Sequence, residues 1–125
     1  MRFAVRPELR RIVAVEAHRR RSGRCPIRVH SLGTGETFAI EPQPDGFLDV
    51  TTGTSVRSRG DAIVLSDGSV PVELRLVGDI LFEGIEHPGG EPFFGRAGGG
   101  SSVTIYDRAQ NDYFQFALGT EQDRI

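Results

Sequence analysis

The sequence contains no lysine and no tryptophan, only one cysteine, and no long apolar run. All basic residues are arginine, a usage that codon bias in a GC-rich genome explains. Without lysine, the chain alone cannot perform P-loop phosphate binding, Schiff-base chemistry or pyridoxal-phosphate chemistry. One cysteine cannot form an internal disulfide, and no segment approaches the roughly 18 apolar residues that span a membrane. Because the first residues also lack the apolar stretch of a secretory signal, we expect a cytoplasmic protein with no membrane span.

Glycine is absent from residues 1–22, although the chain has 16 glycines. This stretch predicts an amphipathic helix, because Pro7 suits the first helical position and Gly23 can adopt the left-handed turn that ends a helix. The expected core-facing side chains, which share one helix face, are Leu9, Ile12, Val13 and Ala17. The alternative is a strand through residues 12–15, because β-branched side chains favour strands.

After Gly23, turn signals recur about every ten residues between short apolar runs. This spacing is typical of an antiparallel sandwich or a small barrel. One hairpin is predicted around Asp67 and Gly68, followed by a strand whose inward side chains are Val72, Leu74 and Leu76. The last hairpin is predicted to pair Tyr106 with Tyr113 across neighbouring strands.

We therefore predict a mostly β protein with one N-terminal helix, folded as a single domain over residues 1–125. The helix occupies residues 1–23, the β-rich body residues 24–118, and a frayed tail residues 119–125. No internal repeat is present.

A glycine-rich segment, residues 86–102, shows little periodicity and predicts a long loop. Its large apolar side chains are Phe93 and Phe94, which either fold back onto the core as a lid or contact a partner. The GRAGGGSS run within it resembles a phosphate-binding loop in composition. A strand rather than a helix is predicted to follow this run, so a flexible loop is favoured.

Charge is divided between the two parts of the chain. Residues 1–30 carry nine arginines and two glutamates, a formal charge of +7, and residues 31–125 carry six arginines and fifteen acids, a formal charge of −9. The basic segment either docks on the acidic body or binds an anion from outside. We predict a non-catalytic binding or regulatory module for an anionic ligand, such as a nucleotide or an acidic protein. The arginines expected to bind it are Arg19, Arg20, Arg21, Arg24 and Arg28.

Arg20 and Arg24, spaced as R-x-x-x-R and followed by the apolar run CPIRV, resemble the start of a PilZ domain. The second PilZ motif, D/N-x-S-x-x-G, has its nearest match at residues 49–53, with threonine in place of serine and the glycine one residue early. The resemblance implies a small β-barrel that binds a cyclic dinucleotide.

Few residues suggest metal binding or catalysis. His18, Cys25 and His30 match no structural zinc spacing, and Cys25 is expected to be a small buried apolar group. We predict no metal, no cofactor and no catalytic residue. An alternative prediction is a small hydrolase or isomerase that uses Glu83, Glu86 and His87.

Two further partners remain open. In one alternative, the protein is a structural subunit of a homo-oligomer, in which the basic segment of one copy attracts the acidic body of another. In the other, Tyr106 and Tyr113 stack on bases of a nucleic acid. The neighbouring Asp107 and Asp112 count against nucleic acid, because carboxylates repel phosphates.

Overall fold

The structure is a computed structural model that describes residues 7–68, 71–86, 92–98, 100–108 and 110–119. One helix precedes ten strands in the chain. The elements are α1 (Pro7–Ser22), β1 (Arg28–Ser31), β2 (Thr37–Gln43), β3 (Gly46–Asp49), β4 (Thr54–Arg59), β5 (Ala62–Leu65), β6 (Val72–Val77), β7 (Leu81–Glu86), β8 (Pro92–Arg96), β9 (Ser102–Asp107) and β10 (Asp112–Gly119).

The ten strands form a closed antiparallel barrel in which each strand pairs with its neighbours in the sequence. The ring closes where β1 pairs with β10, in a register that places Val29 opposite Leu118. This confirms the barrel rather than the sandwich. Because the ring is closed, the sheet has no free edge strand at which another chain could add.

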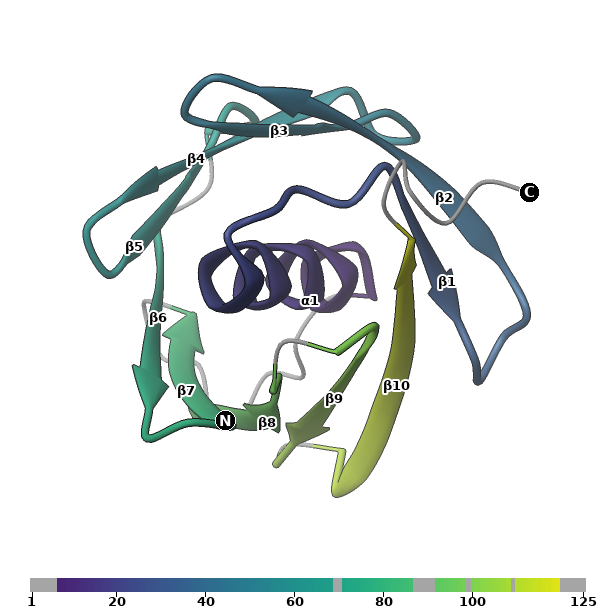
Figure 1. The fold of residues 1–125 in the computed structure, drawn as a ribbon, viewed down its shortest axis with the longest axis vertical. Helices are drawn as coiled ribbons and strands as arrows, with labels where there is room; N and C mark the ends of the chain where they lie inside the picture. Colours follow the sequence, from purple (N-terminus) through teal and green to yellow (C-terminus); the bar gives the residue numbers. More distant parts are fainter. Residues whose placement is uncertain (1–6, 69–70, 87–91, 99, 109, 120–125) are drawn as a thin grey trace.

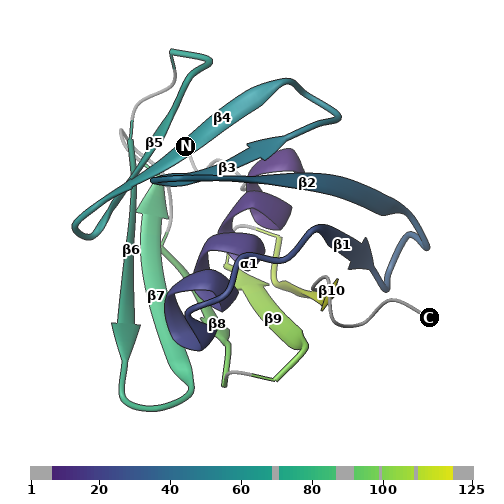
Figure 2. The same ribbon diagram turned by 45° about the horizontal axis from the view of Figure 1, so that its top comes forward.

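Helix α1 lies inside this ring, and the strands surround it in both views (Figure 1 and Figure 2). Its predicted core-facing side chains are all buried, but Ala14, Val15, Glu16 and His18 on the other sides are buried as well. The predicted N-terminal helix is confirmed, and its burial extends beyond the predicted face to every residue from Leu9 to His18. A barrel of this many strands encloses more space than inward side chains alone fill, so the helix becomes its core.

The ends of α1 are as the sequence predicts. The helix begins at Pro7, and Gly23 follows its last residue with a φ of 76°. The Gly23 amide donates a hydrogen bond to the carbonyl of Arg19 (2.9 Å), which closes the helix. Residues 12–15 are helical, so the alternative of a strand there is wrong.

Both predicted hairpins are confirmed. Gly68 has a φ of 84° in the turn between β5 and β6, and the inward Val72 and Leu74 are buried. In the β9–β10 hairpin, Tyr106 pairs directly with Tyr113, and Asn111 in the turn has a φ of 54°.

The prediction of one long loop over residues 86–102 is wrong, because strand β8 lies within it. The glycines on this strand and on β7 make room for aromatic rings. A Cβ atom on Gly84 would lie 2.4 Å from the ring of Phe93, and one on Gly95 would lie 2.1 Å from the ring of Phe82. Gly84 faces Phe93 across the two strands and Gly95 faces Phe82, so each glycine is covered by the phenylalanine opposite. At Gly84 and Gly95, glycine therefore reflects close packing between paired strands.

Candidate functional site

Three of the arginines predicted to bind an outside anion are engaged within the molecule. Arg19 and Arg20 both donate to the carboxylate of Glu16, each with a shortest distance of 2.8 Å. Glu16 is fully buried at the centre of the helix. A buried carboxylate is costly unless it is paired and hydrogen-bonded, and these two guanidinium groups supply both.

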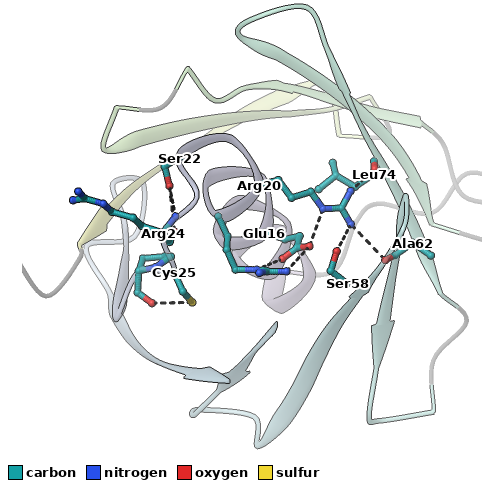
Figure 3. Close-up of polar contacts among 10 residues, drawn as sticks. Glu16, Arg20, Ser22, Arg24, Cys25, Ser58, Ala62 and Leu74 are labelled. Carbon is teal, nitrogen blue, oxygen red and sulfur yellow. Dashed lines mark hydrogen bonds and ion pairs between the residues drawn. The ribbon is translucent and has the colours of Figure 1, made fainter. Parts of the chain in front are cut away.

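Arg20 also connects the helix to the barrel wall. Its guanidinium group donates to the carbonyl of Leu74 (2.7 Å) and to the hydroxyl of Ser58 (3.2 Å). Figure 3 shows this side chain extending from the helix towards Leu74, Ser58 and Ala62, while Arg24 points away from the Glu16 cluster.

Arg21 donates to three backbone carbonyls, those of Ala97, Gly78 and Leu81, each at 2.9 Å. The planar guanidinium fork therefore holds together the segments before β7 and after β8. Arg20 and Arg21 thus contact the body of the protein, whereas Arg19 pairs with Glu16 of its own helix. For Arg20 and Arg21, the barrel acceptors are carbonyl and hydroxyl oxygens rather than carboxylates.

The five predicted arginines do not converge on one site. Arg28 lies on β1, beside a shallow surface depression that His30 and Thr37 also line. Arg24 and Arg28 both make contacts within the protein. An outside anion at either residue stays a prediction.

Cys25 lies partly buried against the core, as expected for a small apolar side chain. Burial raises the pKa of its thiol to about 11, and the opposing effect of the Arg19 charge is smaller. Because the thiolate is the nucleophilic form, this environment disfavours nucleophilic chemistry at neutral pH. Among the described residues, no group of three histidine, cysteine or acidic side chains is placed to hold a metal ion.

The alternative hydrolase or isomerase site is only partly described. Glu83 on β7 pairs with the guanidinium group of Arg75 on β6. Glu86 is the last residue of β7, and His87 lies outside the described residues. Phe93 and Phe94, predicted together as a partner contact, point in opposite directions, because Phe93 is 1% exposed in the core and Phe94 is 37% exposed. Only Phe94 is placed to touch a partner.

A cavity of about 670 Å³ lies where the first turn of α1 meets the β1–β2 hairpin and β10. We call it the N-terminal cavity. Its lining combines two arginines of the helix with aromatic and polar side chains of the barrel, and includes Arg10, Arg11, Ser31, Leu32, Glu36, Phe38, Asp112 and Phe114.

Each arginine in this cavity lies on an aromatic ring. The guanidinium carbon of Arg10 is 3.7 Å from the ring centroid of Phe114, and that of Arg11 is 4.1 Å from the ring centroid of Phe38. Arg11 also donates two hydrogen bonds to Asp49, at 3.0 and 2.8 Å. Its charge is therefore matched within the protein.

Arg10 also has interactions within the protein besides the ring of Phe114. Burial lowers the pKa of its guanidinium group, and the nearby carboxylates of Asp107, Asp112 and Glu8 oppose this shift without cancelling it. The guanidinium group remains protonated at any physiological pH. An anionic ligand group next to Arg10 would further stabilise its buried positive charge.

Sequence analysis missed Arg10, Phe38 and Phe114 as site residues, because their proximity depends on the helix lying inside the barrel. One feature of the sequence could have indicated that the helix is buried. Residues 12–15 are four consecutive apolar residues, which together cover all sides of a helix. A helix that is apolar all round is buried, and its flanking arginines must then find partners inside.

Comparison with known proteins finds no matching protein family, no matching curated protein and no matching solved structure. The resemblance to the PilZ family therefore stays a prediction. In this fold, Arg20 of the first motif contacts the barrel wall, and Asp49 of the second motif binds Arg11. The helix in the described part of the chain is not long and apolar enough to cross a membrane.

Proposed function

We propose that this protein is a non-catalytic binding module whose ligand is a small molecule with an apolar body and one anionic group, bound in the N-terminal cavity. The observation that carries this proposal is the buried guanidinium group of Arg10 on the ring of Phe114, inside a cavity of about 670 Å³. Pockets for small molecules commonly enclose about 300–1,000 Å³ and combine apolar walls with a few polar groups.

The position of the anionic group follows from the charges around the cavity. Asp112 lies near Arg10 and offsets part of the Arg10 charge. Glu36 is exposed and lines the same cavity, so it disfavours an anion near it. The carboxylate or phosphate of the ligand would therefore lie on the Arg10 side, and its apolar body would lie against Phe38 and Leu32. This keeps the predicted anion-binding role of the N-terminal segment but assigns it to Arg10 rather than to Arg19, Arg20 and Arg21.

A cytoplasmic location belongs to the same proposal. It is supported by the single cysteine, which requires no oxidising compartment.

The proposal is tested by thermal unfolding with sodium decanoate and, separately, with decanol, which has the same chain but no charge. Decanoate at about 100 times its Kd should stabilise the protein by about 2.7 kcal/mol. For a domain of this size, that corresponds to a rise in Tm of roughly 10 °C. Decanol should raise the Tm less, and Arg10→Gln should remove the difference between the two compounds.

A pair of glycine variants tests the position of the ligand. Gly33 lines the cavity and Gly100 does not, and a Cβ on either would meet no atom within 4 Å. Gly33→Trp should block the decanoate effect, while Gly100→Trp should leave it intact. Equal shifts by decanoate and decanol in the unaltered protein would refute the anionic ligand, and an unchanged decanoate effect in Gly33→Trp would refute the cavity as its site.

A further inference from the structure

The outer face of the barrel carries three aromatic side chains in one row. Phe94 on β8 pairs directly with Tyr106 on β9, and Tyr106 pairs with Tyr113 on β10. Directly paired residues lie on the same face of a sheet, and neighbouring strands are about 4.8 Å apart. We call these three residues the aromatic row.

Phe94 and Tyr113 are open to solvent, and Tyr106 between them is half-buried. Phe94 is 37% exposed and Tyr113 is 66% exposed. The ring centroids of Tyr106 and Tyr113 are 4.8 Å apart, and the rings are tilted by 47°. The hydroxyl of Tyr106 donates to the side-chain oxygen of Asn111 at 2.5 Å, which orients that ring. This spacing leaves no room for a base between the two rings, so a ligand would stack on their outer faces.

A second row lies beside the first. Arg96 on β8 pairs with Leu81 on β7 and with Thr104 on β9. Leu81, Arg96 and Thr104 line a shallow depression of about 290 Å³ together with the aromatic row. The depression is therefore a shallow surface with the guanidinium group of Arg96 at one side.

Arg96 is exposed on this face, and Arg108 is exposed in the turn that follows β9. At the other end of the row, Glu83 lies directly opposite Phe94 and pairs with Arg75. A phosphate is therefore favoured at Arg96 rather than at the β7 end of the row, where Glu73 is also exposed on β6.

Of the two carboxylates that counted against nucleic acid, Asp107 is withdrawn from the surface and Asp112 is exposed next to Tyr113. Asp107 is 1% exposed, inside the barrel. Asp112 lines the N-terminal cavity and accepts a hydrogen bond from the backbone N–H of Tyr113 at 2.8 Å. Neither acid therefore lies within the aromatic row.

We propose that the aromatic row binds a short segment of single-stranded nucleic acid, with bases stacked on Phe94, Tyr106 and Tyr113 and a phosphate at Arg96. Aromatic side chains on the open face of a sheet stack bases of any sequence, and adjacent arginines bind the backbone. The surface is shallow and three rings wide, so one nucleotide would leave part of it uncovered. The aromatic row shares Tyr113 with the N-terminal cavity, but its other two rings lie outside that cavity, and the proposal does not depend on the ligand proposed there.

The test is fluorescence anisotropy with labelled single-stranded RNA and DNA of about eight nucleotides, a length within the usual range for such surfaces. At low salt, both should bind. Tyr113→Ala should weaken binding by about 5- to 150-fold, because each stacked base contributes that much. Tyr113→Phe should retain the affinity, since the ring remains. Arg96→Gln should reduce the slope of log affinity against log salt by about 1.

The controls separate this site from others. Val50 is a comparably exposed apolar residue in the turn after β3, so Val50→Ala should leave binding unchanged. Gly33→Trp, which blocks the N-terminal cavity, should also leave it unchanged. Phe94→Ala is a second variant of the aromatic row and should weaken binding.

Four results would overturn the proposal. The first is that Tyr113→Ala and Phe94→Ala both bind as tightly as the unaltered protein. The second and third are that a single nucleotide, or a duplex, binds as tightly as the single strand. The fourth is a dimer, detected by sedimentation, that both variants abolish. The last result would show that a second copy of the chain, and not nucleic acid, covers this face.

Discussion

At the scale of single residues, Arg11 and Asp49 show how this barrel accommodates charge in its interior. Their side chains are 8% and 0% exposed, and Asp49 also accepts a hydrogen bond from the hydroxyl of Thr52 at 2.6 Å. With the ring of Phe38 over the guanidinium group, both charged groups have partners within the protein. Such a pair contributes little net stability, but breaking it leaves one buried charge without its partner.

Asp49→Asn should therefore reduce the free energy of unfolding by about 3–5 kcal/mol. The measurement is urea denaturation of the variant and the unaltered protein. The matched control is Glu83→Gln, which breaks an ion pair whose side chains are 65% and 36% exposed, and should cost less than about 1 kcal/mol. If Asp49→Asn lowered the free energy of unfolding no more than Glu83→Gln does, the buried Arg11–Asp49 ion pair would be contradicted.

At the scale of elements, strands β7 and β8 fit the helix because their inward positions alternate between phenylalanine and glycine. Phe82 covers Gly95, and Phe93 covers Gly84. The small residues let the rings lie flat against the barrel wall instead of projecting into the space that the helix fills. Arg21 then joins the ends of the same two strands through three carbonyls.

Gly95→Ala should destabilise the protein by about 3 kcal/mol, at the upper end of the usual range for overpacking. The added Cβ would lie 2.1 Å from the Phe82 ring and 2.4 Å from the backbone oxygen of Thr104, and the backbone cannot easily yield. The control is Gly33→Ala, where a Cβ meets nothing within 4 Å and should cost far less. If Gly95→Ala and Gly33→Ala had the same midpoint of urea denaturation, the close packing of Gly95 against Phe82 would be contradicted.

At the scale of the whole molecule, the closed ring of strands and the enclosed helix depend on each other. The helix supplies the centre of the hydrophobic core, with Leu9, Ala14, Val15 and Ala17 all fully buried. The strands form an unbroken hydrogen-bonded ring around it. The ring has no core without the helix, so we expect the two to unfold together.

Amides inside α1, such as that of Val15, should therefore exchange hydrogen only through global unfolding. Native-state hydrogen exchange should give them the same opening free energy as the amide of Ile105 in the barrel wall. Amides in the exposed turn between β1 and β2, such as that of Thr34, should exchange much faster. A clearly lower opening free energy for Val15 than for Ile105 would mean that the helix leaves an intact barrel.

Much of the local structure follows from the sequence alone, because it depends on neighbours in the chain. Pro7 and Gly23 mark the ends of the helix, Gly68 and Asn111 lie in turns, and the alternation around Leu74 places that side chain inside. The mostly β class follows from the same short-range signals.

The position of the helix was decided only by the tertiary structure, because it depends on contacts between residues far apart in the chain. Closure of the ring surrounds the helix, so Arg20, predicted to bind an outside anion, donates to the carbonyl of Leu74, 54 residues away. It also brings Arg10 onto Phe114, which creates the N-terminal cavity. No local pattern records these pairs, since composition and periodicity report which side chains prefer to be buried and not which of them meet.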